Sequence, residues 1–200
     1  MGREILSKNL KSKGRLFLIT GIGFALVSLF MIMIFIPDGF HPAIVCFTII
    51  LIVGIIFIYF GIDFFKGENS KYIRRNPTIL TKVDELFKNA VYNDNFFVIS
   101  DKLIASKDDL MNIADLNDVL VIYENIQRMN GIIVSHDINL ELRKGKTIAI
   151  CVYGKKSETT DNILLTISKY CPNAMVGYTN ESISYLFEQR KLYKKNKWFI

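Results

Sequence analysis

Residues 16–36 read LFLITGIGFALVSLFMIMIFI, and residues 43–62 read AIVCFTIILIVGIIFIYFGI. Neither stretch contains a charged residue, and each holds 14 residues of the Leu, Ile, Phe or Val type. A helix rises about 1.5 Å per residue, so each stretch is long enough to cross a hydrocarbon core of about 30 Å. A buried core helix of this length normally shows a polar stripe, which both stretches lack. The pattern predicts two transmembrane spans, at 16–36 and 43–65.

The residues that flank the two spans predict a hairpin and its orientation. The linker PDGFHP at 37–42 contains two prolines and a glycine, which break a helix and favour a tight turn. Residues 1–15 carry five basic residues and residues 66–75 carry four, whereas the linker carries none. Lys and Arg concentrate on the cytoplasmic side of a membrane. We expect a protein integral to the cytoplasmic (plasma) membrane, with both termini in the cytoplasm.

Small residues line one face of each predicted span. Gly21, Ala25 and Ser28 share a face of the first helix, and Gly54 and Gly61 share a face of the second. Small residues let helices approach closely in lipid. Two uses of these faces are open at this stage: packing of the hairpin within one chain, and homo-oligomerisation.

The charge is distributed unevenly along the chain. The net charge is +6, but residues 76–189 hold 11 basic and 15 acidic residues, which is a net charge of −4. The positive charge therefore lies beside the spans and in residues 190–200, where it suits anionic lipid headgroups. Nucleic acid is not expected as a partner. A hydrophobic content of 50% also excludes a wholly disordered chain, and three cysteines exclude a disulfide-dense secreted scaffold.

Residues 76–200 have the pattern of a separate cytoplasmic α+β domain, whereas residues 1–75 hold the N-terminal arm and the transmembrane hairpin. Asn76-Pro77 is a helix start, and the apolar spacing that follows predicts a helix over 77–91. Apolar runs then predict five or six strands, arranged as a meandering antiparallel sheet or a partial barrel, at 96–99, 103–106, 119–123, 132–134, 138–142 and 147–153.

The remaining elements follow from local signals. His136 falls between two predicted strands and is expected at a turn or on the surface. A helix is expected from Ser157 to Cys171, then a last strand at 174–178. Asn180 can cap a final helix with Ile183, Leu186 and Phe187 on one side.

Four segments of this domain carry a resemblance to a known kind of protein. They are the hairpin FFVISDKLIAS at 96–106, the strand VLVIY at 119–123, the hairpin NLELRKGKTIAICVY at 139–153, and CPNAMVGY at 171–178. Together they resemble an uncharacterised bacterial membrane-protein family with a two-span N-terminal hairpin and a pleckstrin-homology-like cytoplasmic domain. The resemblance implies an α+β fold in which a small antiparallel β-rich domain with flanking helices acts as a scaffold for binding and assembly. It implies neither catalytic residues nor a cofactor.

Catalytic motifs are weak throughout the chain. Two histidines and no paired-cysteine motif give no ligand set for a metal. Cys151 and the acidic pairs Asp108-Asp109 and Asp115/Asp118 are the candidates for an enzyme of unknown reaction, which is the main alternative. An accessory subunit of a transport complex is a second alternative. The favoured hypothesis is a membrane-anchored, non-catalytic interaction or scaffold module that binds a protein partner, lipid headgroups or itself.

The C-terminus combines basic and aromatic residues. It contains five cations, Arg190, Lys191, Lys194, Lys195 and Lys197, followed by the aromatic pair Trp198 and Phe199. Cations approach anionic lipid, and aromatic side chains prefer the membrane interface. These residues are the candidate membrane-surface contacts. A solvated tail without a ligand is the alternative.

The orientation of the hairpin can be tested by labelling intact cells with a membrane-impermeant thiol reagent. A single cysteine placed at Gly39 is expected to react, because the loop without basic residues faces outward. A single cysteine placed at Ser157 is expected to be spared. The reverse pattern would overturn the orientation and the cytoplasmic assignment of the C-terminal domain.

Overall fold

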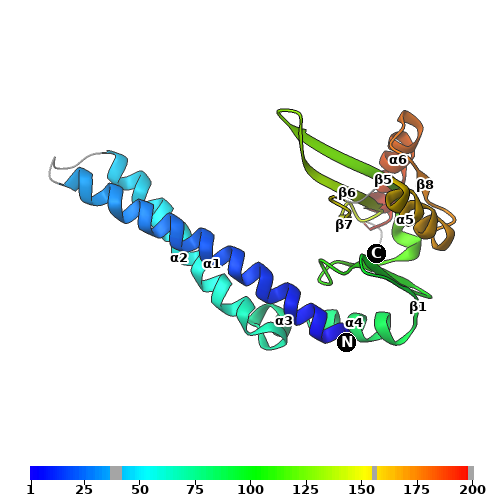
Figure 1. Cartoon of the computed structure of the whole chain (residues 1–200), viewed down its shortest axis with the longest axis horizontal. Helices are drawn as coiled ribbons and strands as arrows, with labels where there is room; N and C mark the ends of the chain where they lie inside the picture. Colours follow the sequence, from blue (N-terminus) through cyan, green and yellow to red (C-terminus); the bar gives the residue numbers. More distant parts are fainter. Residues whose placement is uncertain (37–41, 155–156, 198–200) are drawn as a thin grey trace. The chain divides into compact units, whose positions relative to one another are not determined.

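The computed structural model describes residues 1–36, 42–154 and 157–197. The chain divides into two compact units, Met1–Thr81 and Lys82–Ile200. Their boundary falls inside helix α4 (Thr78–Lys88). The first unit is helical, and the second combines strands with helices (Figure 1). The predicted turn at 37–41 lies outside the described residues.

Two long helices, α1 (Gly2–Phe35) and α2 (Pro42–Phe65), form a hairpin in the first unit. Both are long and apolar enough to be candidate membrane-spanning helices. Their apolar side chains point outward, and Ile19 and Met33 expose 70% and 71% of their surface. An apolar surface of this extent is unusual on a soluble protein and suggests anchoring in a membrane. Because α1 begins at Gly2, the basic arm is part of the same helix.

The two helices approach most closely at glycines. A Cβ atom placed on Gly21 would lie 2.7 Å from the carbonyl oxygen of Gly54, and one on Gly54 would lie 2.9 Å from that of Gly21. A Cβ atom on Gly14 would lie 2.9 Å from the carbonyl oxygen of Gly61. The small-residue faces thus pack against each other within one chain.

A carboxylate organises the chain where it leaves α2. Asp63 accepts hydrogen bonds from the backbone N–H groups of Lys71, at 2.9 Å, and Tyr72, at 3.3 Å. These two residues begin α3 (Lys71–Arg75), which follows the short 3-10 helix η2 (Gly67–Asn69). The only acidic residue in the predicted span 43–65 therefore satisfies the free N–H groups of the next helix.

The second unit contains two four-stranded sheets (Figure 1). The first is an antiparallel meander of β1 (Ala90–Asn93), β2 (Phe97–Ser100), β3 (Leu103–Ser106) and β4 (Ile113–Asp115). The second has the order β7-β6-β5-β8, with β5 (Val119–Met129), β6 (Ile132–Leu142), β7 (Thr147–Cys151) and β8 (Met175–Val176). Strand β8 runs parallel to β5, and the other neighbours are antiparallel. The remaining elements are η3 (Leu116–Asp118), α5 (Ser157–Tyr170) and α6 (Asn180–Lys197).

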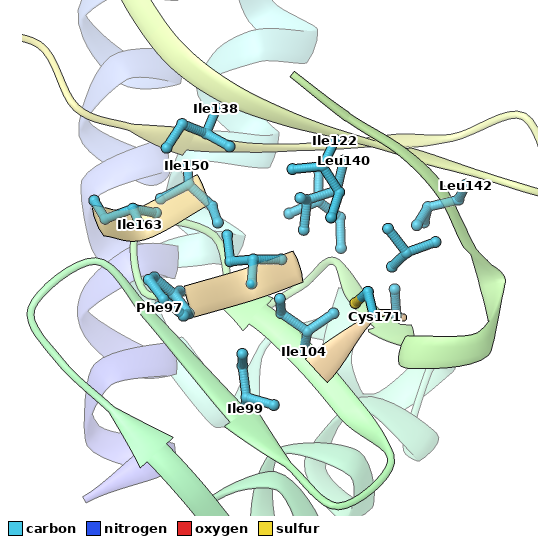
Figure 2. Packing of buried hydrophobic residues seen from close by; sticks show 14 of the residues in the cluster. Phe97, Ile99, Ile104, Ile122, Ile138, Leu140, Leu142, Ile150, Ile163 and Cys171 are labelled. Atoms are coloured by element: carbon cyan, nitrogen blue, oxygen red, sulfur yellow. The ribbon is translucent and has the colours of Figure 1, made fainter. Parts of the chain in front are cut away.

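The main core of this unit lies between the two sheets. Figure 2 shows Phe97 and Ile104 of the first sheet together with Leu140 and Ile150 of the second. Ile163 of α5 completes the same cluster, and all five side chains are at most 4% exposed. The unit thus has one apolar layer that both sheets and α5 share.

Three of the predicted element boundaries are wrong. The helix predicted over 77–91 ends at Lys88, and Ala90 and Val91 belong to β1, where Ala90 pairs with Ser100. Strand β4 is absent from the predicted strands. The single meander or partial barrel is also wrong, because the strands divide into two sheets and β8 pairs in parallel. An exposed apolar residue such as Val91 fits a helix face and an edge strand equally well.

The expectation that His136 lies at a turn or on the surface is wrong as well. Strand β6 is continuous, and His136 lies within it at 9% exposure. Its Nε2 atom is 2.6 Å from Oε1 of Glu124 on β5. The turn lies instead at Asn130 and Gly131, whose φ angles of 51° and 80° are those of a two-residue hairpin turn.

Two glycines that are two residues apart test the close packing of the hairpin. The Gly21→Val change places side-chain atoms against the α2 backbone, so we expect thermal unfolding in detergent to show a loss of about 1–3 kcal/mol, as for overpacked sites. Gly23→Val is the matched control, because a Cβ atom there meets no atom within 4 Å. Both changes alter helix propensity equally. Equal melting temperatures would contradict the packing.

Candidate functional site

Helix α6 is attached to the second sheet, on the side opposite the main core. Leu186 of α6 is 6% exposed and packs with Leu120 and Val121 of β5, which are each 1% exposed. Tyr123 and Tyr185 pack against the edge of this small cluster. Apolar burial therefore fixes the first half of α6 on the strands.

A carboxylate of the sheet attaches the second half of α6. Oε2 of Glu141 lies 2.7 Å from an Nη atom of Arg190 and accepts a hydrogen bond from Thr147. Oε1 of Glu141 accepts a hydrogen bond of 3.1 Å from the hydroxyl of Tyr123. Arg190 also donates from Nε to the backbone oxygen of Leu142. The side chains of Glu141 and Arg190 are only 12% and 23% exposed, so the pair is partly removed from solvent screening.

Burial raises the pKa of Tyr123 above its ordinary value. The phenol therefore stays protonated at neutral pH and remains the hydrogen-bond donor to Glu141.

The turn between β6 and β7 brings more cations next to α6. Its sequence is Arg143-Lys144-Gly145-Lys146, and Gly145 has a φ of +82°, which favours glycine. The Nζ atom of Lys144 lies 2.8 Å from Oδ2 of Asp118. This hydrogen bond raises the pKa of Lys144, so its charge persists at neutral pH.

The turn and α6 together form an open groove of about 730 Å³, called the basic groove below. Its lining residues are Arg143, Lys144 and Gly145 from the turn, and Phe187, Arg190, Lys191, Tyr193 and Lys194 from α6. Five of these eight residues are basic. Carboxylates already hold two of them, since Arg190 binds Glu141 and Lys144 binds Asp118.

The other three cations of the basic groove lack such compensation. Within residues 157–197 and the other described segments, Lys191 and Lys194 have no carboxylate partner, and both are exposed. The Nε atom of Arg143 is buried without a hydrogen-bond acceptor, and its Nη2 reaches only the backbone oxygen of Asn117 at 3.5 Å. A buried donor without an acceptor is unfavourable, and an anion in the groove would supply one.

The structure brings some of the predicted surface-contact residues together. Arg190, Lys191 and Lys194 line the basic groove, whereas Lys195 is exposed on α6 outside the lining. Lys197 ends α6. The predicted contacts Trp198 and Phe199 lie outside the described residues.

Sequence reasoning missed the partners that complete the groove. Arg143 and Lys144 were read only as a hairpin turn, although a turn with three cations around a glycine was a signal of positive potential. Phe187 was expected to share one side of the last helix with Ile183 and Leu186. In the structure Leu186 is buried, whereas Phe187 is 66% exposed beside the groove.

Of the candidates for an enzymatic site, Asp118 contacts a residue that lines the basic groove, namely Lys144. Cys151 is exposed on β7, and burial raises the pKa of the Cys171 thiol to about 11, which keeps it protonated. Two of the acidic residues stabilise turns: Asp109 accepts a hydrogen bond from the backbone of Met111, and Asp115 accepts one from that of Asn117. These contacts give Asp109 and Asp115 a structural role in their turns.

Comparisons with protein-family models, with curated proteins and with solved structures give no match to this chain. A function must therefore be argued from the groove and from the helical hairpin. A surface lined with cations and aromatic rings can bind anions and lie at a membrane interface.

The contact between Glu141 and Arg190 can be tested by unfolding. Arg190→Gln leaves the Glu141 carboxylate without its cation, so we expect a loss of about 1–3 kcal/mol, between the values for exposed and for buried pairs. Lys191→Gln, one residue away, is the control and is expected to change stability by less than about 0.5 kcal/mol. Equal stability of the two variants in urea would show that the pair does not hold α6.

Proposed function

We propose that this chain is a membrane-anchored, non-catalytic interaction module whose C-terminal domain binds an anionic membrane surface through the basic groove. The observation that carries the proposal is the set of three cations, Arg143, Lys191 and Lys194, that the domain leaves uncompensated in one groove. A protein partner and a second copy of the chain are the competing occupants of the groove.

The helical hairpin supplies the anchor in this proposal. Its two apolar helices span the membrane, and both termini face the cytoplasm, as the basic residues on either side of the spans suggest. The C-terminal domain then lies next to the leaflet that carries anionic lipids in many membranes. Tethering keeps the local concentration of that surface high, so weak contacts suffice to hold the domain.

Charge and aromatic side chains supply the contact. Each cation near an anionic surface contributes about 1 kcal/mol, and salt weakens this attraction. Lys191, Lys194 and Lys195 are exposed on α6, and the ring of Phe187 beside them suits the interface. Lys197, Trp198 and Phe199 extend the same composition to the chain end.

The order of the elements supports a pleckstrin-homology-like arrangement for residues 90–170. A four-stranded meander, β1 to β4, is followed by the three antiparallel strands β5 to β7 and then by α5. Strand β8 and helix α6 come after that arrangement. The basic groove is therefore lined partly by α6, an element that follows the pleckstrin-homology-like arrangement. In this proposal α6 is the element that adapts the scaffold to its ligand.

The proposal is tested with the full chain in nanodiscs, using the single tryptophan, Trp198, as the reporter. We expect a blue shift of its emission with phosphatidylglycerol in the bilayer, compared with phosphatidylcholine alone, because the tail docks on anionic lipid. Raising the salt from about 0.1 M to about 1 M shortens the Debye length from about 10 to 3 Å and should reverse the shift.

Two double variants make the test specific to the groove. Lys191→Gln/Lys194→Gln should lose most of the shift, whereas Lys102→Gln/Lys169→Gln removes the same charge from other exposed sites and should keep it. A shift that is absent, or equal in both variants, refutes the groove as a lipid contact. A shift that depends on a second protein or on protein concentration would identify one of the competing occupants.

A further inference from the structure

Strands β5 and β6 extend well beyond their neighbours in the second sheet. Strand β8 pairs with β5 only at Val121 and Ile122, and β7 pairs with β6 only from Asp137 to Glu141. Residues 126–135 thus form a two-stranded ribbon that the other described strands do not flank (Figure 1). Two strands without further support are only marginally stable in water.

The end of this ribbon is apolar and exposed. Its exposed apolar side chains, called the hairpin tip below, are Ile126, Met129, Ile132 and Val134, with exposed fractions of 40%, 66%, 68% and 53%. Gln127, Arg128 and Asn130 are exposed beside them. The turn between them is the two-residue Asn130-Gly131 turn. Exposed positions of a ribbon with only a structural role would carry polar side chains, because apolar side chains stabilise a fold only when they are buried.

Apolar residues lie on both faces of the tip. Met129 is paired with Ile132, whereas Arg128 is paired with Ile133, and successive pairs point to opposite sides of the ribbon. A protein surface covers one face of a ribbon, but a bilayer surrounds an inserted tip on both faces. This favours lipid as the occupant over a second copy of the chain.

The charge of the tip suits an anionic bilayer. Between Glu124 and Asp137, Arg128 is the only residue of the Asp, Glu, Lys and Arg types. An inserted tip therefore takes no carboxylate toward the membrane, and its one cation can stay among the headgroups. From Ile126 to the turn the ribbon is about 13 Å long, which is more than the depth of about 5–10 Å that apolar faces reach at the boundary of headgroups and acyl chains, so the ribbon is long enough for its end to insert.

Only part of the hairpin tip lies on the side of the second sheet that carries α6. Met129 follows Tyr123 by six residues, so strand alternation puts both on the same side. The hydroxyl of Tyr123 contacts Glu141, which binds Arg190 of α6.

From these observations we propose that the tip of the β5–β6 hairpin inserts into the bilayer that anchors the chain, as a second, apolar contact beside the basic groove. The proposal rests on the membrane anchoring in the proposed function, but it uses different residues and a different force. Insertion buries apolar surface, so salt does not weaken it, whereas the contact at the groove is electrostatic.

The test places a tryptophan at the tip of the full chain. In a Trp198→Phe background, Ile132→Trp and Met129→Trp are each reconstituted into nanodiscs whose lipids carry bromine on the acyl chains, which quench tryptophan at close range. Leu165→Trp is the matched control, since Leu165 is 57% exposed and lies on α5, on the other side of the second sheet. All three positions are exposed, so the changes leave the core intact.

We expect the two tip reporters to be quenched at least about threefold more strongly than Leu165→Trp, and equally at about 0.1 M and about 1 M salt. Adding Ile132→Asp to the Met129→Trp reporter should remove most of this quenching. Quenching by the brominated lipids that is no stronger than in the control overturns the proposal. Acrylamide, a water-soluble quencher, then shows whether the tip lies in water, where acrylamide quenches it, or is shielded by a second protein. If Trp198 of the native chain still responds to anionic lipid, the tip proposal fails alone; if that response is also absent, the proposed function fails with it.

Discussion

The carboxylate of Glu141 accepts hydrogen bonds from the side chains of Arg190, Thr147 and Tyr123, and the arrangement of the C-terminal unit depends on it. The three donors come from α6, β7 and β5, and Glu141 itself belongs to β6. A carboxylate this little exposed is unfavourable unless its lone pairs are used. These contacts therefore link α6 to the three strands β5, β6 and β7.

The same contact explains how the groove becomes positive. Because Glu141 binds Arg190, the following turn of α6 presents Lys191 and Lys194 beside the β6–β7 turn. Asp118 holds Lys144 in a corresponding way. Glu141 and Asp118 thus each position one cation, and the charges of the neighbouring Lys191 and Lys194 are not neutralised by a carboxylate partner among the described residues. Residues 76–189 are acidic in sum, yet this surface is basic, because three of its five cations, Arg190, Lys191 and Lys194, follow that range in the sequence.

The helical hairpin could be predicted from the sequence, because long apolar stretches and small-residue faces are local signals. The two apolar stretches became α1 and α2, and Gly21 meets Gly54 as the spacing suggested. The length of β5 and β6 was missed, since Asn125, Gln127 and Ser135 read as loop residues when their cross-strand partners are unknown. The Asn130-Gly131 pair was the local signal that would have joined the two strands.

The groove could be predicted only in part. The cations of α6 are visible in the sequence, but their pairing with residues of β6 is a contact across 49 positions, from Glu141 to Arg190. Spacing along a helix shows which residues share a face, and it does not show which face packs. The spacing therefore grouped Phe187 with Leu186, but it did not show that Leu186 packs on the sheet while Phe187 stays exposed.

Strand β6 is a single continuous element, with the hairpin tip at one end and the cationic turn at the other. Its 11 residues span about 36 Å, and a hydrogen-bonded strand neither stretches nor shortens appreciably. The distance between the two ends of β6 is therefore set by the length of the strand. A surface that touches both ends at once must therefore be nearly flat over that length.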